Sequence, residues 1–168
     1  MTTVQPASRT QGGVAALFAA AVIAAGAAYV KPWESGGKVH TVPYRDIVGV
    51  LTVCDGITGK GVIEGKPYTK AECEALLQER VAEAYSHVQR CIKNPNLNQA
   101  VALTSATFNI GPRVVCGSTL QKYANAGDWN RACAELLRWN KAGGREVNGL
   151  TLRRIDENAV CMTPPQGG

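Results

Sequence analysis

The chain opens with a polar stretch that is followed by a long apolar one. Residues 1–13 are polar, and residues 14–30, VAALFAAAVIAAGAAYV, carry no charged side chain. A membrane-spanning helix needs about 20 apolar residues, so this run is short, and its many alanines make its transfer into lipid only weakly favourable. Pro32 should end the helix, because proline interrupts helical hydrogen bonding. The pattern divides the chain into a polar tail (1–13), an apolar segment (14–30) and a body (31–168).

Three fates are open to the apolar segment. Ala25-Gly26-Ala27 resembles a signal-peptidase site, and cleavage there would make the segment a removed signal peptide. A permanent anchor is the second, and the weak hydrophobicity argues against it. The third is an anchor that can leave the membrane, because little free energy separates the two locations of a marginally apolar helix. Arg9, the only basic side chain before the segment, predicts a cytoplasmic N-terminus and a periplasmic body.

The body begins with a pattern that is typical of a β-hairpin. Residues 50–55, VLTVCD, are mostly β-branched and apolar, and Gly56 closes them, which predicts a short strand. The preceding Val48-Gly49 has the character of a turn. A chain that folds back there can bring Asp46 and Thr52 to the same site, so a hairpin is expected.

The remainder of the body has a helical pattern. Thr69-Lys70-Ala71-Glu72 has the form of a capping box, and the apolar positions that follow recur at helical intervals as far as Ile92. Residues 97–110 predict a buried core helix, and further helices are expected from Ser118, over 129–139 and over 149–161. The expected fold class is therefore α+β: a mainly helical fold with a small β-hairpin lobe, plus the N-terminal hydrophobic helix.

Composition narrows the range of partners. The 168 residues carry a formal net charge of +5 with a pI near 9.0, which favours an anionic partner such as a phospholipid surface or a cell wall. No run of Lys and Arg with interleaved aromatic residues is present, so nucleic acid is disfavoured.

Six cysteines lie in the body, and none lies in the apolar segment. They include no C-x-x-C pair, and the chain has only two histidines, so a structural zinc site is disfavoured. An even number of widely spaced cysteines is typical of disulfides in an oxidising compartment. The sequence leaves their pairing open.

Three residues are candidates for catalysis. Glu34 is the only carboxylate upstream of Asp46, and Thr52 lies on the predicted strand. One carboxylic acid can protonate a leaving oxygen while a carboxylate and a hydroxyl position the attacking water. A simpler interpretation stays open, in which Asp46 caps the turn at Val48-Gly49 and Thr52 is an ordinary strand residue.

The stretch PYRDIVGVLTVCDGITG resembles the T4 lysozyme-like phage endolysins, glycoside hydrolase family 24, whose pattern is Glu, then Asp, then Thr. Five further motifs follow in the family's order: NQAVALTSATFNIG, CGSTL, NAGDW, ELLRWNKAGG and GLTLRRIDENAVC. The resemblance covers Glu34 to Cys161. The spacing from Asp46 to Thr52 matches the family, whereas Glu34 lies three residues before the usual register at Gly37, a difference that the Gly36-Gly37 pair can absorb.

The resemblance implies hydrolysis of the β-1,4 bond between N-acetylmuramic acid and N-acetylglucosamine in peptidoglycan, by a monomer without metal or cofactor. Glu34 would protonate the leaving oxygen, and ionised Asp46 with Thr52 would hold the water or stabilise the transition state. The implied sugar contacts are Gly56, Phe108, Ser118 and Thr119. Two alternatives are a lytic transglycosylase, which gives 1,6-anhydro products, and a non-catalytic wall-binding protein.

The apolar segment resembles the signal-anchor-release (SAR) segments of lambdoid-phage endolysins. This implies an inactive form tethered in the host inner membrane, and an active periplasmic form after residues 14–30 leave the membrane and repack. Some relatives switch by thiol exchange with a cysteine in the anchor. Residues 14–30 contain no cysteine, so refolding alone would activate this chain.

Two features of the body remain. Ile57 stands where relatives usually have the histidine of GHTG, and we expect this change to affect local stability more than chemistry. Arg153-Arg154 beside Asp156-Glu157 could clamp the carboxylates of a peptide substrate. A cluster of salt bridges on a helix surface is the favoured interpretation.

Overall fold

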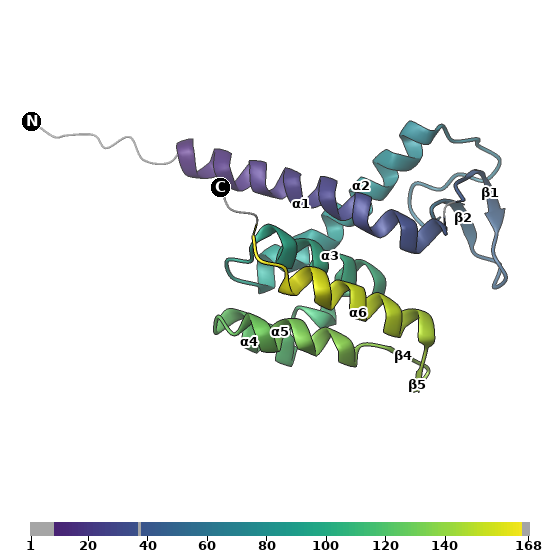
Figure 1. Ribbon diagram of the computed structural model, residues 1–168. Coiled ribbons are helices and arrows are strands. Elements are labelled where there is room, and N and C mark those ends of the chain that lie inside the picture. The colour runs from purple at the N-terminus through teal and green to yellow at the C-terminus, as the bar shows by residue number, and fades with distance from the viewer. Residues whose placement is uncertain (1–8, 37, 166–168) are drawn as a thin grey trace, which may run out of the picture.

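The computed structural model describes residues 9–36 and 38–165. Residues 1–8 of the predicted polar tail and Gly37 of the predicted glycine link lie outside the described residues. The long helix α1 (Arg9–Ser35) crosses the body, and only its first turns extend past it (Figure 1).

The expectation that Pro32 ends this helix is wrong, because α1 continues through Pro32 to Ser35. Proline removes the hydrogen bond to the carbonyl four residues earlier, which here belongs to Ala28. Both Ala28 and Pro32 are exposed, so water can satisfy that carbonyl oxygen. The continuation matters because it places Glu34 on the same helix as the apolar segment.

A central helix, α3 (Leu97–Ile110), organises the body and packs against α1, α2 and α6. Residues 99–107, most of which are small or apolar, are buried, as the sequence predicts. The other helical elements are α2 (Lys70–Cys91), η1 (Pro112–Val114), α4 (Thr119–Asn125), α5 (Trp129–Glu135), η2 (Leu136–Arg138) and α6 (Asn148–Met162).

The helix starts follow from local capping. Thr69 and Glu72 form the predicted capping box at the start of α2, and Asn96 with Gln99 forms a second one at the start of α3. Ser118 caps α4 through its side chain. The helix predicted over 129–139 instead ends at Glu135, and a 3-10 turn completes it.

The β-lobe is a three-stranded antiparallel sheet in the order β1-β2-β3. Its strands are β1 (His40–Arg45), β2 (Leu51–Cys54) and β3 (Ile57–Thr58), and Figure 1 shows the lobe beside the C-terminal end of α1. A separate hairpin joins β4 (Lys141–Ala142) to β5 (Arg145–Glu146). The observed fold confirms the predicted α+β class with a mainly helical body, a small β-lobe and an N-terminal apolar helix.

Helix α1 contributes to both hydrophobic cores. Val22 joins the larger core of the helical body, whereas Ala27 and Val30 join a smaller core under the β-lobe with Val53 of β2. The C-terminal half of α1 is therefore docked. Near the other end, Val14 and Leu17 are 69% and 74% exposed.

All six cysteines form disulfides, as expected from their number and spacing. Each cysteine pairs with its neighbour in sequence order: Cys54–Cys73, Cys91–Cys116 and Cys133–Cys161. The first bridge ties β2 to α2, and the last ties α5 to α6. None of the three involves α1.

Candidate active site

Glu34, the predicted proton donor, lies in the last turn of α1. Its Oε1 atom accepts a hydrogen bond from Nη1 of Arg153 on α6 at 2.6 Å. The Glu34 side chain is 23% exposed, whereas that of Arg153 is only 5% exposed. The Arg153 guanidinium also lies 5.8 Å from the ring centre of Trp33. The Glu34 carboxylate is thus accessible to solvent, while its hydrogen bond to the buried Arg153 guanidinium fixes its position.

A buried polar network holds Arg153 in turn. Arg153 Nε donates to Glu157 Oε1 at 3.2 Å, and Arg153 Nη2 donates to Ser105 Oγ at 3.3 Å. Ser105 Oγ donates to the same Glu157 oxygen at 2.6 Å. Burial raises the pKa of Glu157, and the Arg154 guanidinium opposes that rise. Because Arg153 is bonded on several sides, it has little freedom to follow a displaced Glu34.

The interpretation of Arg153 and Arg154 as part of a surface cluster is wrong. Arg153, Arg154 and Glu157 are 4%, 0% and 0% exposed, so their charges are paired inside the protein. A sequence signal for this burial exists on α3. Ser105 and Asn109 are spaced four apart on one face of this helix, and both bond to the arginines of α6.

Asp46 organises the turn between β1 and β2. Its Oδ1 atom accepts from the amides of Val48 at 3.0 Å and Val50 at 2.8 Å. The turn closes on Gly49, whose positive φ of 81° suits glycine. The simpler interpretation of Asp46 as a turn cap is therefore correct. It is compatible with a catalytic role, since Oδ2 has no hydrogen-bond donor among the described residues.

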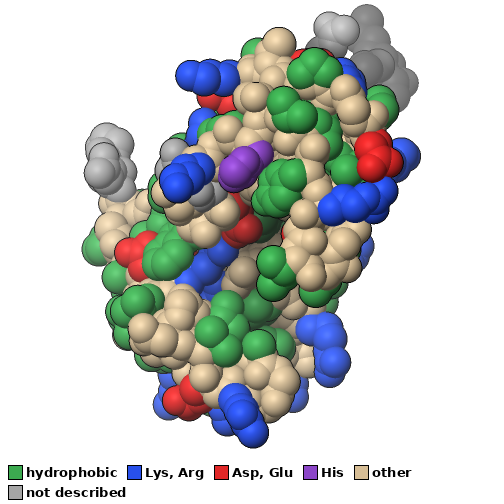
Figure 2. All heavy atoms as spheres, turned by 90° about the vertical axis from the view of Figure 1, so that its right-hand side faces the viewer, with side chains coloured by type: hydrophobic (Ala, Val, Ile, Leu, Met, Phe, Trp, Pro, Cys, Tyr) green, Lys and Arg blue, Asp and Glu red, His purple; other side chains and the backbone are tan. Residues whose placement is uncertain are grey.

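Thr52 lies on the central strand β2, opposite Tyr44 of β1 and Thr58 of β3. It is 4% exposed, and its Oγ1 atom donates to the carbonyl of Val50 at 3.0 Å. Figure 2 shows the face that includes the β-lobe. That face is hollowed near its centre, and acidic and basic side chains lie next to each other in the hollow.

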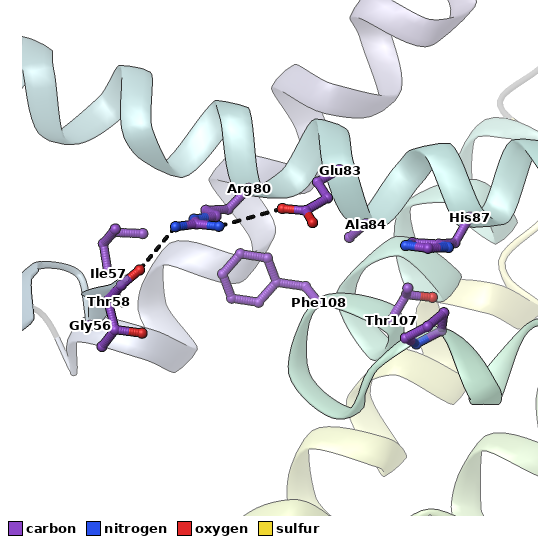
Figure 3. Close-up of a pocket in the computed structure, with 10 residues that line it drawn as sticks. Gly56, Ile57, Thr58, Arg80, Glu83, Ala84, His87, Thr107 and Phe108 are labelled. Carbon is purple, nitrogen blue, oxygen red and sulfur yellow. Dashed lines mark hydrogen bonds and ion pairs between the residues drawn. The ribbon is translucent and has the colours of Figure 1, made fainter. Parts of the chain in front are cut away.

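The first of two neighbouring hollows lies between the β-lobe, α2 and α3 (Figure 3). It encloses about 360 Å³ and contains two of the predicted sugar contacts, Gly56 and Phe108. Its other lining residues are Ile57, Thr58, Arg80, Glu83, Ala84, His87, Thr107 and Pro112. In Figure 3 the Phe108 ring points into the space between the β-lobe and α2.

Arg80 bridges this hollow beside Ile57. Arg80 Nη2 donates to the carbonyl oxygens of Thr58 at 2.9 Å and Lys60 at 3.0 Å. Ile57 itself is 3% exposed and packs in the small core. A link between the β-lobe and α2 therefore exists without a histidine at position 57.

The other two predicted sugar contacts, Ser118 and Thr119, line a second hollow of about 410 Å³. Its remaining lining residues are Arg113, Cys116, Gly117, Glu135, Arg138 and Trp139. Ser118 also donates to the carbonyl of Val114 at 2.7 Å, so its hydroxyl is used in the fold. The four predicted contacts thus form two pairs in different hollows, and neither lining includes Glu34, Asp46 or Thr52.

Comparison with known proteins gives the family. A model of the phage lysozyme family matches residues 34–157, beginning at Glu34. The chain belongs to the phage lysozyme family. The SAR-endolysin of Enterobacteria phage P21 is 39% identical and covers 94% of this chain and 97% of its own length. The SAR-endolysin of Escherichia phage Mu is 38% identical, and the match covers 87% of this chain and 88% of that protein.

Solved phage lysozymes share the fold. The active form of the P1 phage endolysin Lyz superposes with a TM-score of 0.73 at 25% identity, over 82% of this chain and 83% of that one. A P22 lysozyme mutant has a TM-score of 0.69 at 28% identity, over 82% and 95%. The predicted lysozyme-like fold and the prediction of a muramidase enzyme are confirmed. These matches favour neither the transglycosylase nor the wall-binding alternative.

The contact of Arg153 with Glu34 was not predicted from the sequence. A clue was available in the opposite charges of the two residues, but they are separated by 119 positions. Among the described residues, no group of three or more His, Cys, Asp or Glu could hold a metal ion.

Proposed function

We propose that this protein is a phage endolysin that hydrolyses the β-1,4 bond between N-acetylmuramic acid and N-acetylglucosamine, and so lyses the host cell. The observation that carries the proposal is the Glu34–Arg153 contact of 2.6 Å in a chain of the phage lysozyme family. A buried arginine keeps one partly exposed carboxyl group at a defined place in the last turn of α1. That is what a proton donor to a bound sugar requires.

In this proposal Glu34 gives its proton to the leaving glycosidic oxygen as the bond breaks. Asp46 remains ionised, with Oδ1 held by two turn amides and Oδ2 left for the attacking water or the developing positive charge. Thr52 supports the same water from the adjoining strand. The sugars on either side lie along Gly56 and Phe108 in one hollow and along Ser118 and Thr119 in the other.

Glu34→Gln tests the assignment. The variant should keep the fold and lose at least about a hundredfold in the rate at which purified murein clears, because the proton donor is gone. Glu64→Gln is the matched control, since Glu64 forms an exposed pair with Arg45 at 3.0 Å. Clearing by Glu34→Gln at the wild-type rate would refute the role of Glu34. Mass spectrometry of the products separates reducing sugars from the 1,6-anhydro sugars of a transglycosylase.

Anchoring and release are part of the proposal. Residues 12–34 form a helix long and apolar enough to cross a membrane by length and composition. In the folded chain the C-terminal half of this helix is docked instead, with Val22 and Val30 fully buried. We assign the docked arrangement to a released, monomeric periplasmic form. The tethered form lies in the host inner membrane through residues 14–30, with the N-terminus cytoplasmic.

Cell fractionation and N-terminal sequencing test this part. The chain should appear first in the membrane fraction and later in the soluble fraction, with an unchanged N-terminus in both. A soluble protein that starts near Ala28 would show cleavage instead of release.

A further inference from the structure

Helix α1 reaches α6 through two polar contacts. The first is the Glu34–Arg153 contact, and the second joins the hydroxyl of Tyr29 to Oδ2 of Asp156 at 2.5 Å. Residue numbers rise along α1 as they fall along α6, so the two helices run antiparallel where they meet. Tyr29 lies in the apolar segment 14–30 and Glu34 in the body, so both sides of that boundary contact the same helix.

The other contacts of docked α1 are mostly apolar. Val22, Ala27 and Val30 pack into the two cores, which removes apolar surface from water and turns one face of the helix towards the body. A hydrogen bond is different, because its strength depends on distance and angle. The two contacts to α6 can therefore define the rotation of α1 more narrowly than apolar burial does. A further ion pair joins Lys31 of α1 to Glu74 of α2 at 3.3 Å, but Glu74 is largely exposed, so this pair constrains the rotation less.

Helix geometry explains why two contacts are needed. Tyr29 and Glu34 are about 7.5 Å apart along α1, and Arg153 and Asp156 are about 4.5 Å apart along α6. Two long side chains, Tyr29 and Arg153, bridge this mismatch from opposite helices. With one contact alone, α1 could still turn about that point. Two contacts at different positions along the helix axis oppose such a rotation of α1.

We propose that Asp156 is a positioning residue which, by accepting the hydroxyl of Tyr29, sets the rotation of docked α1 and so brings Glu34 to Arg153. The inference rests on the proposed function of Glu34 and adds a mechanism of activation to it. In the tethered form Tyr29 is in or at the membrane, and the contact with Asp156 is absent. The anchor itself thus supplies an interaction that the active site needs.

The electrostatics of the pair agree with this role. Burial and the Asp156 carboxylate raise the pKa of Tyr29, so its hydroxyl remains a proton donor. Glu157 adds to the rise, and Arg153 opposes it. Asp156 is exposed and, among the described residues, has no hydrogen-bond donor other than Tyr29.

The test uses Tyr29→Phe, Asp156→Ala and the double variant, each as full-length purified protein acting on purified murein. Each single variant should lose about three- to tenfold in kcat with KM unchanged, because sugar binding does not involve this contact. The double variant should be no worse than either single one, since both remove the same interaction. Tyr123→Phe is the matched control, because Tyr123 lies on α4 beside Arg131.

Hydrogen exchange gives a second readout that does not depend on activity. In Tyr29→Phe and Asp156→Ala the amides of residues 26–35 should exchange faster, while those of α3 keep wild-type protection. Wild-type kcat and wild-type exchange in Tyr29→Phe would overturn the proposal. So would a loss confined to one single variant, additive losses in the double variant, or an equal loss in Tyr123→Phe. Full activity of Glu34→Gln would refute the proposed function instead, and the exchange experiment would still decide the role of Asp156.

Discussion

Gly26 of α1 lies so close to Val81 of α2 that a Cβ atom at position 26 would be 3.1 Å from Val81 Cγ1. Glycine inside a helix lowers helix stability by roughly 1 kcal/mol relative to alanine. At position 26 this loss accompanies a close contact between the two helices. The contact lies in the docked half of α1 and depends on the absence of a side chain.

Gly26→Val should therefore weaken docking, because neither Val81 nor the α1 backbone can move away freely. We expect a smaller soluble fraction and a lower melting temperature of the soluble protein. Gly13→Val is the control, since it adds the same apolar side chain to α1 where nothing lies within 4 Å. Equal effects of the two substitutions would show that hydrophobicity, and not the close contact, is responsible.

Arg80→Met should loosen the β-lobe. It removes the two hydrogen bonds to the carbonyl oxygens of Thr58 and Lys60 while keeping most of the side-chain volume. The free energy of unfolding should fall by about 1–2 kcal/mol, measured by chemical denaturation. Arg131→Met, which breaks an exposed pair with Asp128 and a contact with the Tyr123 ring, should change it by less than about 0.5 kcal/mol. If Arg80→Met lowers the free energy of unfolding by no more than Arg131→Met does, the bridging role of Arg80 is contradicted.

Arg153→Lys should damage activity more than stability. Lysine keeps the positive charge but lacks the planar fork that bonds Glu34, Glu157 and Ser105 together. We expect a loss of about tenfold or more in kcat, with unfolding free energy lower by about 1–3 kcal/mol. Arg145→Lys on exposed β5 is the control. Retention of wild-type kcat would show that Glu34 needs no buried arginine.

Stability should fall in acid through the capping box of α2. The backbone amide of Thr69, with help from Lys66 and the Thr69 hydroxyl, lowers the pKa of Glu72 to about 2 from its ordinary value of 4.5. A depressed folded-state pKa stabilises the protein above the unfolded value, and this contribution disappears as pH falls from 4.5 towards 2. The melting temperature of Glu72→Gln should decline less over this window than that of wild type. Glu79→Gln, on the same helix outside the box, should decline as wild type does.

Elements with local causes could be predicted from the sequence. The start of α2 at its capping box and the bounds of α3 follow from residues within one turn of each helix end. The turn between β1 and β2 follows in the same way from Asp46 and Gly49. In each case the deciding interaction joins residues fewer than five positions apart.

The errors concern long-range burial. Pro32 did not end α1, because the carbonyl that it leaves unbonded faces solvent, and only the packed structure determines which side that is. Arg153 and Arg154 looked like surface residues because their partners Ser105 and Asn109 lie on another helix. The disulfide pairing likewise depends on which helices are neighbours. The catalytic roles of Glu34, Asp46 and Thr52 stay predictions.

The positions of the three disulfides allow the body to be oxidised before α1 docks. Every bridge closes within the body, between cysteines that are adjacent in sequence order, and no bridge reaches α1. In the proposed tethered form, oxidative folding can therefore run to completion while residues 14–30 are still embedded in lipid. Docking of α1 after release would then be a purely noncovalent event, in which a body with all its disulfides formed binds its last helix.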